Sequence, residues 1–121
     1  EDADLQAELA LVAAGIDVMR CPLDGHGRLD LRAAMALLGA RGLTRVFSEG
    51  GPTLADAMAR EGLIDDLFIG TAPTPLGRPG RPAIDPHLRE SLDRDFRLVG
   101  SRLIERDVIE HFERRACLPV S

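Results

Sequence analysis

The sequence predicts an α/β fold with three layers: a mostly parallel sheet flanked by helices, with an antiparallel hairpin at the C-terminus. Two observations predict this class. Segments with the apolar spacing of a helix alternate with short apolar segments that end at glycine or proline, which is the pattern of α/β crossovers around a parallel core. Near the C-terminus, two apolar segments are separated only by residues 105–107, which is typical of a hairpin.

The composition limits both the size and the chemistry of this fold. With 121 residues, of which 45% are hydrophobic, we expect a single compact domain over residues 1–121. Its core should be aliphatic, because the sequence has 4 Phe, no Trp and no Tyr. The sequence contains no Lys, which excludes a lysine Schiff base. A net charge of −5 argues against binding to nucleic acids or acidic membranes. A small molecule or another protein is therefore the expected partner.

No sequence pattern predicts a metal site or a membrane span. The cysteines and histidines lack the close spacing of metal ligands, and no apolar run approaches the roughly 18 residues of a membrane helix. The acidic N-terminal sequence also lacks the basic region of a signal peptide. We therefore predict a cytoplasmic protein with reduced thiols and without a metal.

The first part of the chain predicts a helix, a strand and a second helix. Apolar residues with helical spacing begin at Leu5, and Gly15 is placed to end that helix. Residues 16–21 form a short apolar run, which predicts a buried strand. Asp30 is placed to cap the second helix, and Gly42 follows its end.

The remaining elements continue the alternation as far as a proline-rich segment. Residues 43–48 predict a second strand, Pro52 begins a third helix, and residues 67–69 predict a third strand. Residues 71–86 are rich in proline and predict a loop over a site or a flexible connection. The hairpin strands are predicted at residues 96–104 and 108–112.

The turn over residues 46–54, Val-Phe-Ser-Glu-Gly-Gly-Pro-Thr-Leu, is the best candidate for a binding site. Two glycines allow the backbone to approach a ligand closely, and the helix that follows directs its dipole at the turn. The N–H groups of Gly51, Thr53 and Leu54 could therefore bind an anion such as phosphate. Glu49 lies at the carboxyl end of the predicted strand, where ligands of open α/β sheets bind. The local sequence is equally compatible with a tight turn that binds nothing. Taken by itself, Glu49 fits a solvated turn carboxylate better than a ligand-binding one.

Three sequence blocks resemble, in the right order, the reductase domain of riboflavin biosynthesis. They are Ser-Glu-Gly-Gly-Pro-Thr-Leu at 48–54, Gly-Leu-Ile-Asp-Asp-Leu at 62–67 and Ala-Pro-Thr-Pro-Leu-Gly at 72–77. Residues 27–31 and 105–108 are also similar to this family, so the resemblance covers nearly the whole chain. The family's reductase domain usually accompanies a deaminase domain in one bifunctional protein and has a dihydrofolate-reductase-like fold. This chain resembles the C-terminal half of that domain.

The resemblance implies an NADPH-dependent reductase that converts the ribosylamino side chain of a pyrimidine phosphate to a ribitylamino chain, in a homodimer. No catalytic residue is assigned, because the nicotinamide supplies the hydride and the protein positions the reactants. The family's first central strand, with most contacts to the substrate phosphate and the nicotinamide, precedes the matched region. The resemblance implies substrate binding by Glu49 and cofactor binding by Gly50, Gly51, Pro52, Thr53, Leu54, Ala55, Asp56 and Ala57.

Two other functions are compatible with the same residues. A related reductase of this fold could act on a pterin or on another pyrimidine. A non-catalytic module could instead keep the cofactor half of the fold and serve in nucleotide binding or dimerisation. A further strand-rich segment encoded upstream of Glu1 would support the enzyme.

Overall fold

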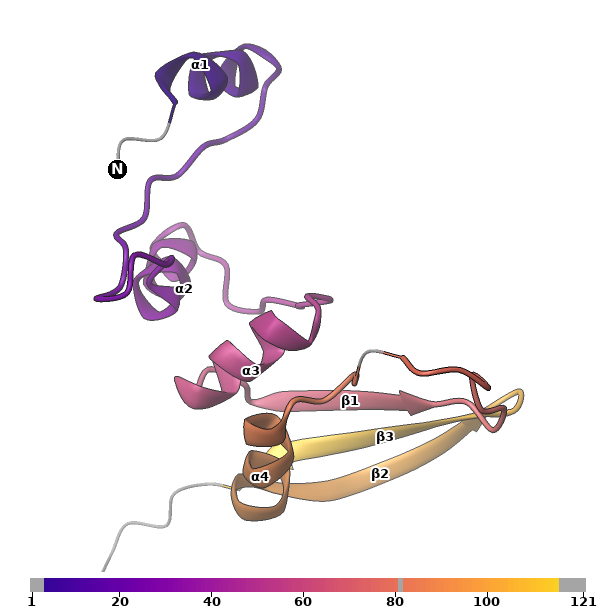
Figure 1. The fold of residues 1–121 in the computed structure, drawn as a ribbon. Helices are drawn as coiled ribbons and strands as arrows, with labels where there is room; N and C mark the ends of the chain where they lie inside the picture. The colour runs from indigo at the N-terminus through magenta and orange to yellow at the C-terminus, as the bar shows by residue number, and fades with distance from the viewer. Residues whose placement is uncertain (1–3, 81, 116–121) are drawn as a thin grey trace, which may run out of the picture. The chain divides into compact units, whose positions relative to one another are not determined.

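The computed structural model describes residues 4–80 and 82–115 of the chain (Figure 1). The chain divides into two compact units, residues 1–46 and residues 47–121. The described residues form four helices and three strands, none of which crosses the boundary between the units. In order these are α1 (Leu5–Ala13), α2 (Leu31–Ala40), α3 (Pro52–Arg60), β1 (Asp66–Thr71), α4 (Pro86–Asp95), β2 (Phe96–Ile104) and β3 (Asp107–Arg114).

The first unit contains α1 and α2, and local capping determines where these helices begin and end. The Asp30 carboxylate accepts a hydrogen bond from the Ala33 N–H at 2.9 Å, which confirms the predicted N-cap of α2. Gly15 follows α1 and Gly42 follows α2, with φ values of 79° and 83°. Glycine adopts this left-handed conformation without steric cost, so both predicted helix ends are confirmed.

The strands predicted at residues 16–21 and 43–48 are not formed. Neither segment has a strand partner among the described residues. The side chains of Ile16 and Val46 are each 49% exposed. Branched residues favour an extended backbone, but a strand becomes stable only when a neighbouring strand binds its N–H and C=O groups. The apolar pattern in these segments therefore indicates a preference for extended backbone, but no described strand pairs with either segment.

The second unit contains an antiparallel sheet with the strand order β1-β3-β2. β3 pairs with β1 from Asp66–Glu113 to Thr71–Val108 and with β2 from Phe96–Arg114 to Ile104–Asp107. The predicted hairpin is confirmed. The predicted mostly parallel sheet is wrong for the described residues, because the parallel crossovers required the two strands that do not form and β1 pairs with β3 instead.

The core of the second unit lies where α3 and α4 pack on each other and α4 packs on β2. α4 has no counterpart among the predicted elements, since it begins at the end of the predicted loop over residues 71–86. Its sequence does contain a helical signal: Pro86 at the first position, followed by Leu88 and Leu92 four residues apart. Figure 1 shows α4 at the end of the sheet where β1 and β2 begin. The buried apolar residues are Met58, Ala59, Leu88, Leu92 and Phe96.

The described chain therefore has an α/β fold with a three-stranded antiparallel sheet and four helices. In the part of the chain that the structure covers, every helix is too short or too polar to traverse a lipid bilayer.

Candidate functional site

The start of α3 presents N–H groups that no described residue of the chain binds. Gly51 precedes the helix, and Pro52 occupies its first position. The N–H groups of Leu54 and Ala55 donate to the Gly51 carbonyl at 3.0 and 3.2 Å. Those of Gly51 and Thr53 have no hydrogen-bond partner within residues 4–80 and 82–115. Of the three N–H groups expected to bind an anion, Leu54 is thus engaged in the turn, whereas Gly51 and Thr53 are available. We call the N–H groups of Gly51 and Thr53 the α3 anion site.

The two glycines of this turn have different steric surroundings. A Cβ atom on Gly50 would lie 2.5 Å from Cδ2 and 3.1 Å from Cβ of Leu54. A Cβ atom on Gly51 would meet no atom within 4 Å. Gly51 has φ −65° and ψ 177°, which any residue can adopt. A side chain at position 50 would therefore force Leu54 to shift, while the space beside Gly51 is open to a ligand.

Glu49 is exposed and lies immediately before the two glycines. Its carboxylate has no hydrogen-bond or ion-pair partner among the described residues. The Gly50 N–H donates to Ser48 Oγ at 3.4 Å, a weak contact within the turn. Because the strand predicted before Glu49 does not form, only this turn positions the carboxylate. Its predicted role in substrate binding stays a prediction.

Asp56 differs from the other predicted cofactor-binding residues because its side chain is only 11% exposed. One carboxylate oxygen accepts from Arg60 Nε at 2.8 Å, and the other accepts from the Leu88 N–H at 3.2 Å. The hydrogen bond from Arg60 is the main reason why the pKa of the Asp56 carboxyl lies below its ordinary 3.8. Asp56 therefore lies between α3 and α4, while Ala55 and Ala57 are half-buried along α3.

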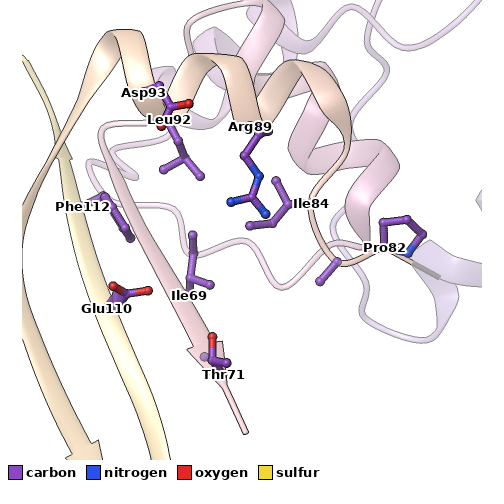
Figure 2. Close-up of a pocket in the computed structure, with 11 residues that line it drawn as sticks. Ile69, Thr71, Pro82, Ile84, Arg89, Leu92, Asp93, Glu110 and Phe112 are labelled. Carbon is purple, nitrogen blue, oxygen red and sulfur yellow. The ribbon is translucent and has the colours of Figure 1, made fainter. Parts of the chain in front are cut away.

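A pocket of about 420 Å³ lies beside α4, the segment before it, and one face of β1 and β3 (Figure 2). Ile69 and Phe112 are among its apolar lining residues, and Arg89, Asp93 and Glu110 contribute charges of both signs. Figure 2 shows the Arg89 side chain pointing from α4 toward Ile69. None of the predicted site residues lines this pocket. Sequence analysis missed it because its walls come from distant segments.

The opposite face of the sheet brings together Asp66, His111 and Glu113, whose potential ligand atoms lie within 4.8 Å of one another. His111 Nε2 lies 2.7 Å from Asp66 Oδ1, and Glu113 Oε2 pairs with Arg97 at 3.0 Å. The ring of His111 also stacks on Phe68 with centroids 4.3 Å apart. The alternation of His111 and Glu113 along one strand was the only local signal. Since both carboxylates are engaged by neighbouring side chains, we assign no ion to this cluster.

Comparisons with known proteins identify the family. Residues 2–109 match the family described as "RibD C-terminal domain". The chain is 42% identical over 55 residues to the riboflavin biosynthesis protein RibD of Escherichia coli (strain K12), an alignment that covers 46% of this chain and 15% of that protein. The structure described as Acinetobacter baumannii RibD, form 2, is similar with a TM-score of 0.64 and 24% identity, over 88% of this chain and 29% of that chain.

The chain thus spans only a minor part of the length of both relatives. The family match nevertheless includes the turn at residues 48–51, the whole of α3 and most of the remaining chain. This agrees with the three sequence blocks that resemble the reductase domain of riboflavin biosynthesis. The chain therefore belongs to the RibD C-terminal domain family.

Proposed function

We propose that this chain is part of an NADPH-dependent reductase of riboflavin biosynthesis, which reduces the ribosylamino side chain of a pyrimidine phosphate to a ribitylamino chain. Family membership and the name of the E. coli relative support this pathway. The α3 anion site is the observation that carries the cofactor part of the proposal. Its N–H groups are unpartnered within the described chain, and no side chain of the turn covers Gly51.

The residues at the start of α3 fit the phosphates of a dinucleotide. The N–H groups of Gly51 and Thr53 would donate hydrogen bonds to phosphate oxygens, and the positive end of the helix dipole would favour their negative charge. Pro52 lacks an N–H group but fixes the backbone of the first helical residue, which would keep the turn ordered for binding. Gly51 lets the ligand reach the backbone.

Glu49 would contribute to substrate binding rather than to cofactor binding. Its exposed carboxylate can accept hydrogen bonds from the hydroxyl or N–H groups of a sugar-linked pyrimidine. It would also repel phosphate, which argues against a place beside the cofactor phosphates. When bound, NADPH would supply the hydride, so the chain's own residues need only bind, orient and exclude water.

We extend the proposal to assembly as a homodimer in the cytoplasm. β2 lies at an edge of the sheet and bears exposed apolar side chains at Leu98, Leu103 and Ile104. An exposed apolar edge is suited to contact with a second copy of the chain.

A substitution at Gly51 tests the cofactor part of the proposal. Gly51→Val places a branched side chain where phosphate should approach the backbone, in space that the chain leaves open. We expect NADPH affinity, measured by isothermal titration calorimetry, to fall at least tenfold, or about 1.4 kcal/mol. The fold should persist, because a Cβ atom at position 51 meets nothing within 4 Å.

Gly100→Val is the matched control, since Gly100 lies in β2 and a Cβ atom there also meets nothing within 4 Å. It should leave NADPH affinity unchanged. Equal NADPH affinity in folded wild-type and Gly51→Val protein would refute the α3 anion site. NADPH binding without turnover in the full-length polypeptide would instead favour a non-catalytic nucleotide-binding module.

A further inference from the structure

We infer that Asp56 is a positioning residue: its carboxylate joins the first turn of α4 to α3 and thereby fixes the helix that carries the α3 anion site. The effect on the ligand rests on the proposed function. The connection between the two helices rests on the contacts of Asp56 alone.

The first turn of α4 takes its cap from α3. Asp85 occupies the N-cap position, but its side chain makes no capping hydrogen bond. The N–H of Leu88, the third residue of α4, would ordinarily be satisfied by such a cap. It donates instead to Asp56 Oδ1 at 3.2 Å, across 32 residues of sequence. Asp56 therefore satisfies a backbone group of a helix other than its own.

The second carboxylate oxygen is held equally specifically. It accepts from Arg60 Nε at 2.8 Å, one turn further along α3. Asp56 is 11% exposed and Arg60 is 52% exposed, so the ion pair lies at the border of the core with the carboxylate on the inner side. A carboxylate this buried is costly without partners. Its two hydrogen bonds therefore favour one orientation of the side chain and one placement of α3 on α4.

The hydrogen bond between Asp56 and Leu88 lies close to the α3 anion site along α3. Asp56 follows Thr53 by three residues, which corresponds to a rise of about 4.5 Å. A rotation of α3 that breaks the bond to Leu88 would also redirect the N–H groups of Gly51 and Thr53. Arg60 and the positive end of the α4 dipole also offset the Asp56 charge, which would otherwise repel an anion.

Two variants of the 121-residue chain separate positioning from simple loss of charge. Asp56→Ala removes the acceptor of the Leu88 N–H, whereas Asp56→Asn keeps an oxygen acceptor for that N–H but loses the charge and the acceptor of Arg60 Nε. Asp56→Ala should speed amide hydrogen exchange at Leu88 and at Ala55, whose N–H donates to the Gly51 carbonyl in the first turn of α3, about fivefold and weaken NADPH binding about fivefold. Asp56→Asn should stay within about twofold of the wild type in both.

The exposed carboxylate of Asp93 on α4 provides the control, because Asp93→Ala removes a charge without touching this connection. Should Asp56→Ala fail to fold, Asp56→Glu displaces the same contact by one methylene and should also weaken NADPH binding. Wild-type exchange at Ala55 and Leu88 in Asp56→Ala would overturn the connection. Faster exchange with unchanged NADPH affinity would overturn the positioning role. A wild-type chain that bound no NADPH would contradict cofactor binding at the α3 anion site, and the exchange rates would still decide whether Asp56 fixes α3.

Discussion

Helices α3 and α4 begin with the same pattern, a proline at the first position and a leucine at the third, yet their N-termini have different surroundings. Leu54 in α3 is 39% exposed, whereas Leu88 in α4 is 2% exposed. The start of α4 binds the Asp56 carboxylate, while N–H groups at the start of α3 have no partner in the described chain. A helix N-terminus can thus bind an external anion only if no side chain of its own fold reaches it first.

The largest expected effect compares the two leucines. Leu88→Ala should lower the free energy of unfolding by about 3 kcal/mol, because it leaves a cavity in the core between α4 and its neighbours. Leu54→Ala should cost less than about 1 kcal/mol, since that side chain remains partly in water. Urea unfolding of both variants measures the difference. Similar losses would show that the two helix starts are equally packed.

An intermediate effect is expected at the two glycines before α3. Gly50→Ala should destabilise the fold by about 1–3 kcal/mol, because its Cβ atom would overlap the Leu54 side chain. Gly51→Ala should cost less than about 1 kcal/mol, since it meets no neighbour. A double-mutant cycle supplies the control: the cost of Gly50→Ala should shrink when Leu54 is also changed to alanine. An unchanged cost would assign the strain to another contact.

The smallest expected effect is a decrease in the free energy of unfolding at low pH that originates at α4. The hydrogen bonds from Arg94 and Ser91 lower the pKa of Asp95, at the last position of α4, from 3.8 to about 2. A lowered carboxyl pKa stabilises the fold above pH 3.8, and this stabilisation is lost as the pH falls toward about 2. Because Asp95 retains contact with water, we expect the free energy of unfolding to fall by only about 1 kcal/mol.

Asp95→Asn should reduce this acid dependence, measured as the difference in unfolding free energy between about pH 5 and about pH 2.5. The Asp56 carboxyl, whose pKa is also lowered, should add to the loss in the same direction. Both groups hold α4, so hydrogen exchange in acid should rise first there. If hydrogen exchange in acid rose first at the start of α3, then α3 rather than α4 would be the more acid-sensitive helix.

Features that depend on neighbouring residues could be predicted from the sequence. Asp30 caps the helix that follows it, and Gly42 adopts the left-handed conformation that ends that helix. The hairpin of β2 and β3 is likewise local, because only a short turn joins its strands. The turn of the α3 anion site was located in the same way, since its glycines and proline are consecutive.

Features that depend on distant partners could not be predicted in this way. Residues 16–21 and 43–48 have the composition of strands, but composition does not reveal whether a partner strand is present. The antiparallel pairing of β1 with β3 joins segments that are far apart in the sequence. The contact of Asp56 with Leu88 spans 32 residues, so the motif that contains Asp56 gave no sign of it.

The position of β3 has a consequence for the synthesis of the chain on a ribosome. β3 is the last of the strands that the structure describes but the central strand of the sheet, and within the described residues β1 and β2 pair only with it. Both strands leave the ribosome before β3, and the contact between Asp66 and His111 has to close over 45 residues. A nascent chain that stops before Asp107 would therefore carry two strands with no partner, and the sheet would assemble only after the hairpin has emerged.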